Sequence, residues 1–196
     1  MPESLQTLLQ ELLNNSEFLA TALVFIAATL ILLVIFRTRI KTWKQARNTR
    51  RIIKRLGLHA ISHLHLPDGT GGEVMIEHLL LGHNSVIVVS VMRFDGLIFG
   101  GPQTNQWTQV INRRSYKFDN PDQYLQRQIN AIRQIAPGIE IEGRHLFTGG
   151  AKFPRDKPDN VLQYSDFKKL PKRPRTGGIP KQLRSAWKHI VETTGK

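Results

Sequence analysis

Cysteine is missing from this chain of 196 residues. Its absence excludes disulfide bonds, zinc sites built from thiolates and a cysteine nucleophile. Three motifs that would point to a catalytic or phosphate-binding site are missing too, because the sequence contains no GxxxxGK[ST] loop, no HExxH and no GxSxG. These absences argue against a P-loop nucleotide hydrolase, an HExxH metalloprotease and a hydrolase with a serine nucleophile elbow.

Positive charge is missing from the first 36 residues, which carry only three glutamates. Within them, residues 18–36 form an apolar run of 19 residues without any charge. At about 1.5 Å per residue, such a helix spans most of the ~30 Å hydrocarbon core of a bilayer. A signal peptide would need a positive start, a shorter apolar core and a small-residue cleavage site, whereas Arg37 stands where cleavage would fall. A buried soluble helix is the other alternative, and we interpret the run as a transmembrane helix.

Acidic residues are missing from the segment 37–56, which immediately follows the apolar run. The positive-inside rule predicts that this flank and everything after it lie in the cytoplasm, with the N-terminus outside the inner (cytoplasmic) membrane of the cell. The same flank is expected to bind anionic lipid headgroups, at about 1 kcal/mol per charge. Its nine basic residues are Arg37, Arg39, Lys41, Lys44, Arg47, Arg50, Arg51, Lys54 and Arg55.

Ahead of the apolar run, leucines recur at helical spacing within residues 1–17. This pattern predicts a short amphipathic helix on the outer membrane surface. A simple extension of the transmembrane helix is the alternative. The leucines are Leu5, Leu8, Leu9, Leu12 and Leu13.

After residue 56, short apolar runs alternate with turn residues, which predicts an α/β domain with a mixed sheet. Asp95-Gly96 is expected to form a hairpin turn, and Asn120-Pro121 is expected to begin a helix that ends near Ile135. The run 85–92 is apolar on both faces and should be the central strand. Strands are expected at 59–66, 74–81, 85–92, 97–99, 107–111, 115–118, 139–147 and 161–164.

Five histidines fall within 25 residues and raise the possibility of a metal site. They lie on different predicted strands whose register the sequence does not give. Histidines on the solvent face of strands are the simpler interpretation. The five are His59, His63, His65, His78 and His83.

The order of these elements resembles the NERD (nuclease-related) domain, a branch of the restriction-endonuclease-like superfamily, over residues 47–147. The resemblance implies a restriction-endonuclease-like mixed β-sheet core with flanking helices, here preceded by a single transmembrane helix. It is carried by the segments 75–81 and 86–98, by Trp107, and by Asn120-Pro121 with Gln123 and Gln128.

Active members of that family hold a divalent metal through a glutamate in the first helix, an aspartate on the second strand and a Glu-x-Lys on the third. The resemblance places the aspartate position at Glu77 and the Glu-x-Lys at Ser90-Val91-Met92. Serine is a poor replacement for an anionic ligand, methionine has no charge, and the segment 37–56 offers no glutamate. Glu77 with Glu73 could rebuild only a weak Mg²⁺ site. The sequence therefore predicts a degenerate nuclease site and no bound cofactor, with Mg²⁺ expected only if cleavage survives.

Beyond the domain, a basic segment is expected to form an extended arm, followed by a last helix that Ile179-Pro180 opens. We expect this arm to bind nucleic acid through Lys168, Lys169, Lys172, Arg173 and Arg175. The predicted division of the chain is thus an outer segment 1–17, a membrane span 18–36, a basic helix 37–56, a NERD-like domain 57–166 and a C-terminal arm 167–196. The favoured function is a membrane-anchored, non-catalytic module that binds nucleic acid or a partner. A metal-dependent nuclease with a rearranged active site, or a membrane scaffold without a nucleic-acid role, are the alternatives.

Overall fold

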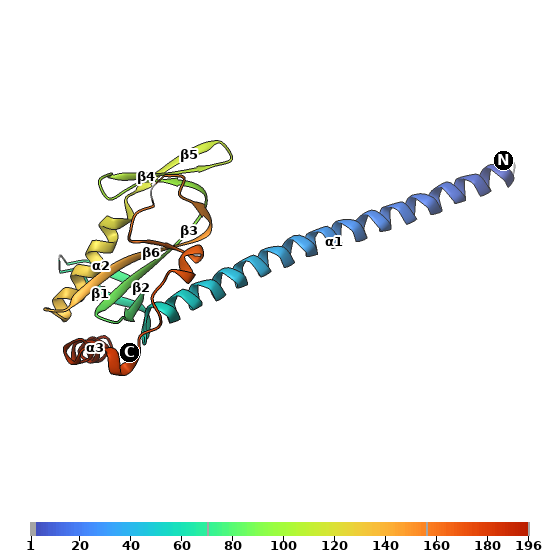
Figure 1. Cartoon of the computed structure of the whole chain (residues 1–196). Coiled ribbons are helices and arrows are strands. Elements are labelled where there is room, and N and C mark those ends of the chain that lie inside the picture. Colours follow the sequence, from blue (N-terminus) through green and yellow to red (C-terminus); the bar gives the residue numbers. More distant parts are fainter. Residues whose placement is uncertain (1–2, 70, 156, 196) are drawn as a thin grey trace. The chain divides into compact units, whose positions relative to one another are not determined.

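The computed structural model describes residues 3–69, 71–155 and 157–195, with the side chains of Gln6 and of residue 20 onward in the first helix. The chain divides into two compact units, Met1–Ala46 and Arg47–Lys196, which are described separately. Figure 1 shows the elements of each.

The first unit is formed by the long helix α1 (Glu3–Leu56), which continues into the second unit. The stretch Ala20–Leu56 contains a window of mean hydropathy 2.4, so α1 is long and apolar enough to cross a membrane. Signal sequences and core helices share that length and composition. The side chains of the expected amphipathic segment, apart from Gln6, lie outside those described.

The last turns of α1 belong to the core of the second unit. Ile52, Ile53 and Leu56 are buried, and they pack with residues of the sheet such as Leu80 and Leu146. On the other side of this part of the helix, Arg51 and Lys54 are exposed and Arg55 is half-buried. The segment is therefore amphipathic, with its apolar side facing the sheet.

The second unit is a seven-stranded mixed sheet among the described residues, as the α/β prediction required. Five strands follow one another as antiparallel neighbours, and β6 pairs in parallel with both β3 and β7. The strands are β1 (Ala60–Pro67), β2 (Glu73–Leu81), β3 (Ser85–Phe99), β4 (Gln106–Ile111), β5 (Arg114–Asp119), β6 (Glu140–Lys152) and β7 (Val161–Gln163).

Strand β3 is the centre of the sheet, and this prediction is confirmed. Its first half pairs with β2 on one side, its last residues pair with β4 on that same side, and β6 runs along its other side. Val86, Val88 and Val89 are fully buried, because both faces of the strand are covered.

The expected hairpin turn at Asp95-Gly96 is wrong. Strand β3 runs through it without a break, and Gly96 pairs with Ala151 of β6. Gly96 has a φ of +85°, and a Cβ there would lie 2.3 Å from the carbonyl oxygen of Val110. The glycine therefore allows a local irregularity and a close approach of β4, where the sequence pattern indicated a reversal of the chain.

Helices cover one face of the sheet. Helix α2 (Pro121–Ile135) and helix α3 (Lys181–Thr194) share one apolar cluster with β1, β2 and β3. Asn120 is the N-cap of α2, since its side chain accepts a hydrogen bond from the backbone of Asp122, and Pro121 is the first helical residue. Both features follow the predicted helix start.

Two 3₁₀ helices, η1 (Tyr164–Lys168) and η2 (Thr176–Gly178), lie between β7 and α3. This segment packs onto the domain in several places and is not a free arm. Pro174 and Ile179 are buried, and the guanidinium of Arg173 donates a hydrogen bond of 2.9 Å to the carbonyl of Leu58.

Candidate functional site

Glu77 lies where strands β2 and β3 separate. The last ladder pair between these strands joins His78 to Val89, one residue from Glu77. Beyond that point, the Glu77 carboxylate accepts a hydrogen bond from the backbone N–H of Val91. The carboxylate thus replaces a strand partner for an amide that would otherwise be unpaired.

A backbone irregularity explains why the Glu77 side chain turns toward β3. In β2, Ile76 and Leu79 both face α2, although two residues instead of one separate them. In β1, two residues likewise separate Ile61 from Leu64. The alternation of the two faces is therefore shifted by one residue in both strands. His63, opposite Glu77 in this register, has a φ of +56°. Positive φ is uncommon for a residue other than glycine and marks a strained position.

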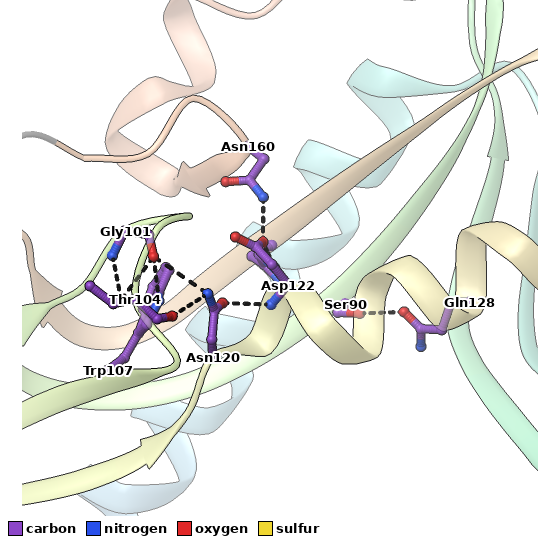
Figure 2. A network of polar contacts seen from close by, with 9 residues as sticks. Ser90, Gly101, Thr104, Trp107, Asn120, Asp122, Gln128 and Asn160 are labelled. Atoms are coloured by element: carbon purple, nitrogen blue, oxygen red, sulfur yellow. Dashed lines mark hydrogen bonds and ion pairs between the residues drawn. The ribbon is translucent and has the colours of Figure 1, made fainter.

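Ser90 is bound to helix α2 through a buried amide. Its hydroxyl donates a hydrogen bond of 3.0 Å to Oε1 of Gln128 (Figure 2). Nε2 of Gln128 donates one of 2.6 Å to the carbonyl of Met75. The Gln128 side chain is only 1% exposed. Ser90 and Gln128 therefore form a neutral chain of hydrogen bonds between β3, α2 and β2.

A pocket of about 270 Å³ opens over Ser90 and Met92. Its walls come from β3, from β6, and from the end of β5 with the first turns of α2. Glu77 is not among the lining residues, so its carboxylate and the Ser90 and Met92 side chains do not share this cavity. The pocket is lined by Ser90, Met92, Asp119, Asn120, Pro121, Gln123, Tyr124, Arg127 and His145.

His145 is a titratable residue of the pocket that the sequence pattern did not select. It lies opposite Ser90 in the parallel β3–β6 ladder, so both side chains point to the α2 face. Its Nε2 is 2.8 Å from Oδ1 of Asp122, which also accepts a hydrogen bond of 2.6 Å from Asn160. Figure 2 shows Asp122 between Asn160 and the start of α2.

The other ring nitrogen of His145, Nδ1, is buried and has no hydrogen-bond partner among the described residues. Burial lowers the pKa of His145, and the Asp122 carboxylate only partly opposes this effect. The imidazole is then neutral at pH 7, with Nε2–H donating to the carboxylate and Nδ1 carrying a free lone pair. The sequence pattern could not reveal this pair, because Asp122 and His145 lie on different elements.

Asn120 fixes the rim of the pocket through the loop before β4. Its amide donates hydrogen bonds to the carbonyls of Thr104 (2.7 Å) and Gly101 (3.4 Å), and Gly101 also accepts one from the indole of Trp107 (Figure 2). Asn120 is 5% exposed and Trp107 is fully buried. Asn120 therefore holds the start of α2 in place through its bonds to the loop and through its N-cap bond to the helix.

The clustered histidines remain on the β1–β2 surface. The rings of His63 and His78 are 6.4 Å apart, and Nδ1 of His78 lies 2.7 Å from the hydroxyl of Ser62. Burial lowers the pKa of His78, Glu77 raises it and His63 lowers it. Within the described part of the chain, no group of three His, Asp or Glu residues is arranged to hold a metal ion.

The basic C-terminal segment lies beside the last turns of α1. Arg51 donates a hydrogen bond of 3.1 Å to the hydroxyl of Tyr164, and Arg55 donates one of 3.4 Å to the carbonyl of Leu170. The guanidinium of Arg55 also lies 5.7 Å from the centre of the Phe167 ring. We call the exposed basic residues of these two segments the basic surface: Arg47, Arg50, Arg51, Lys54, Lys168, Lys169, Lys172, Arg173 and Arg175.

Fold and site together define an α/β domain of the nuclease-like class. The model of the nuclease-related domain, NERD, matches residues 41–148, which is more than half of the chain. The protein therefore belongs to the NERD family.

The chain is also similar to an uncharacterized protein of Bacillus anthracis, with 24% identity over 165 residues that cover 78% of this chain and 77% of the relative. No solved structure matches the chain.

Proposed function

We propose that this protein is a membrane-anchored NERD module that binds nucleic acid and does not cleave it. The observation that carries the proposal is the state of the family's metal-binding positions. By the resemblance, Ser90 and Met92 take the places of the family's glutamate and lysine, and Glu77, at the aspartate position, accepts a backbone hydrogen bond from Val91. A hard divalent cation needs several oxygen ligands, and two neutral side chains do not supply them.

The membrane anchor is supported by the apolar stretch of α1 and by the charges after it. The 19 uncharged residues 18–36 are followed by nine basic and no acidic residues up to residue 55. A single apolar span with a one-sided basic flank is typical of a single-pass membrane protein whose flank faces the cytoplasm.

Nucleic-acid binding is supported by the basic surface. The contacts of Arg51 and Arg55 bring two basic segments together that are more than 100 residues apart in the sequence. Multiple exposed Lys and Arg residues attract phosphates without reading the bases. The Lys168–Arg175 part of this surface lies beyond the membrane flank, so topology does not account for it.

Two assays of the full chain in neutral detergent micelles test the proposal. With Mg²⁺ or Mn²⁺, plasmid and single-stranded DNA should remain intact. Metal-dependent cleavage that disappears in Glu77→Ala would show a rearranged nuclease instead.

In the second assay, duplex DNA should bind, and binding should weaken steeply with salt. About five engaged charges give a slope of log K against log salt of about −4.5. Replacing four basic residues by glutamine should reduce the magnitude of the slope by up to about 3.6. These four are Lys168, Lys169, Lys172 and Arg175.

A matched control removes four exposed charges elsewhere in the domain: Arg114, Lys117, Arg133 and Lys152. This control should bind DNA as the unmodified chain does. Anionic and neutral vesicles are titrated in parallel, because lipid headgroups are the competing polyanion. Binding to anionic vesicles alone, with none to DNA at low salt, would refute the nucleic-acid role and leave a membrane scaffold.

A further inference from the structure

We propose that the basic surface binds single-stranded nucleic acid, with one unpaired base stacked on the ring of Tyr164. This inference rests on the proposed nucleic-acid role and names the substrate class for it. Tyr164 lies beyond residue 148, where the match to the family's domain ends, so the site is separate from the family's metal-binding positions.

The first support is an aromatic pair that the 3₁₀ helix η1 builds. Side chains three residues apart in a 3₁₀ helix lie one above the other. Tyr164 and Phe167 have this spacing, and their rings are stacked with centres 6.0 Å apart and an angle of 20° between their planes. Tyr164 is 40% exposed, whereas Phe167 is half-buried. Tyr164 is therefore the outer ring of the pair.

The second support is that this pair is held in place from inside the domain. Phe167 packs against the apolar cluster that joins the last turns of α1 to the sheet. The guanidinium of Arg55 lies 5.7 Å from the centre of its ring, and Arg51 donates a hydrogen bond of 3.1 Å to the Tyr164 hydroxyl. An aromatic side chain that is fixed before binding loses little conformational entropy when a base stacks on it.

The third support is the charge around the ring. Tyr164 lies where the two segments of the basic surface meet, because Arg51 of α1 contacts its hydroxyl. The one acidic residue within 161–175, Asp166, already forms an ion pair with Lys157. A strand stacked on Tyr164 therefore has exposed cations for its phosphates and no unpaired carboxylate within this segment to repel them.

Stacking on Tyr164 requires a single strand. In a duplex each base lies between its neighbours and shows only its edge in the grooves, so its face does not reach a protein ring. In a single strand the faces of unpaired bases are open, and stacking on an aromatic side chain strengthens binding about tenfold per base. Duplex DNA meets the basic surface through its phosphates alone and gains nothing from the ring.

The test measures binding of the full chain, in neutral detergent micelles, to four probes of about 12 nucleotides per strand. They are oligo(dT), oligo(U), an abasic strand with the same sugar–phosphate backbone but no bases, and a duplex. Oligo(dT), oligo(U) or both should bind about tenfold more tightly than the abasic strand, because the abasic strand offers phosphates but nothing to stack.

Three variants of exposed tyrosines separate stacking from charge. Tyr164→Leu keeps an apolar side chain but removes the ring, so it should weaken binding of the base-containing strand about tenfold and leave the abasic strand and the duplex unchanged. Tyr164→Phe keeps the ring and should retain the affinity, although it loses the hydrogen bond from Arg51. Tyr116→Leu removes a tyrosine of β5 that is 48% exposed and outside the basic surface, and it should change nothing.

Salt dependence provides a second readout. Stacking releases no counterions, so Tyr164→Leu should lower log K by about one unit at every salt concentration without changing the slope against log salt. The variant with four glutamines on the basic surface should instead reduce the magnitude of the slope.

Three results would overturn the proposal. The abasic strand binds as tightly as oligo(dT) and oligo(U), which would leave a phosphate site without stacking. Tyr164→Leu and Tyr116→Leu have the same effect, which would place the bases elsewhere. Tyr164→Phe weakens binding as much as Tyr164→Leu, which would assign the effect to the Arg51 contact and not to the ring.

These outcomes are separable from failure of the proposed function. If no nucleic acid binds at low salt, both the proposed function and this inference are wrong. If the duplex and the abasic strand bind and lose affinity in the variant with four glutamines, while Tyr164→Leu changes no affinity, the basic surface binds phosphates and the stacking site alone is refuted.

Discussion

Glu77 illustrates how a carboxylate that the resemblance places at a metal position can have a structural role. It accepts a hydrogen bond from the amide of Val91 at the point where β2 leaves β3. The adjacent His63 has positive φ, so the local backbone is held in a strained arrangement around this contact. A residue that completes the strand ladder can be retained without any catalytic function.

This role predicts losses of stability of different size for two Glu77 variants. Glu77→Ala leaves the Val91 amide without its partner and should lower the free energy of unfolding by about 1–3 kcal/mol. Glu77→Gln keeps an acceptor oxygen and should lose less than half of that amount. Thermal denaturation of both variants measures the difference. Equal stability of all three proteins would show that the contact contributes nothing.

His145 predicts how stability responds to acid. Burial lowers its pKa in the folded protein relative to the ordinary value of about 6.5. The unfolded state therefore binds more protons in this range, so stability is fully present above about pH 6.5 and is lost as the pH falls toward the lowered value. His78, whose pKa is also lowered, acts in the same direction.

The measurement is the melting temperature between pH 8 and pH 5. His145→Gln should flatten the decline that the unmodified chain shows, while His78→Gln should flatten it less, because His78 is the less buried of the two. A pH profile that is identical in His145→Gln and the unmodified chain would contradict the assignment.

At the residue scale, the resemblance suggested where the family's metal-binding positions fall but not what surrounds them. Glu77, Ser90 and Met92 could be selected from the resemblance, because strand order and spacing place them. His145 and Asp122 could not, because their contact joins the middle of β6 to the first turn of α2. Such a pair depends on the parallel register of β3 and β6, which periodicity does not specify.

At the scale of elements, the strongest predictions came from local backbone chemistry. The start of α2 was predictable because an N-cap and a first-turn proline act within a few residues. The hairpin predicted at Asp95-Gly96 failed because the same dipeptide also suits an irregularity inside a long strand, and pairing with β6 decides between the two. The strands predicted at 107–111 and 115–118 do form a hairpin, and both residues of its turn, Asn112 and Arg113, have positive φ.

Asn120 combines a local and a tertiary role, so its removal should cost more than an ordinary helix cap. Asn120→Ala loses the cap, worth about 1 kcal/mol, and leaves the carbonyl of Thr104 without its donor. We expect a loss of about 2–3 kcal/mol in chemical denaturation. Asn120→Asp keeps the capping oxygen but not the amide donor, so its stability should lie between that of the unmodified chain and that of Asn120→Ala.

Asn130→Ala, at an exposed position of the same helix, serves as the control and should cost less than about 1 kcal/mol. If the Asn120→Asp protein is as stable as the unmodified chain, the contacts to the loop before β4 contribute nothing.

At the scale of the whole molecule, charge distribution is the feature that the sequence reports best. The first 36 residues have no positive charge, and the 19 residues that follow contain nine positive and no negative charges. Composition alone did not show that the last turns of α1 also carry core residues of the domain. Ile52, Ile53 and Leu56 are buried against the sheet, so the basic flank and the domain form one folded unit from Arg47 onward.

This asymmetry predicts the topology, with the N-terminus outside and the domain in the cytoplasm. In right-side-out membrane vesicles, added protease should leave a fragment that contains residues 47–196 intact, and detergent should expose it to digestion. The physical reason is that translocating a flank with nine positive charges is unfavourable, whereas the acidic N-terminus meets no such barrier.

Replacing Arg37, Arg39, Lys41 and Lys44 by glutamine should increase the fraction of molecules in the inverted orientation, because these charges lie closest to the span. Removing the more distant charges Lys181, Arg184 and Lys188 should leave the orientation unchanged, since the rule acts within about 15–20 residues of the membrane. Digestion of the domain in intact vesicles of the unmodified chain would reverse the assignment. A domain recovered in the soluble fraction would instead identify the apolar run as a cleaved signal or a core helix, and the membrane anchor would then be wrong.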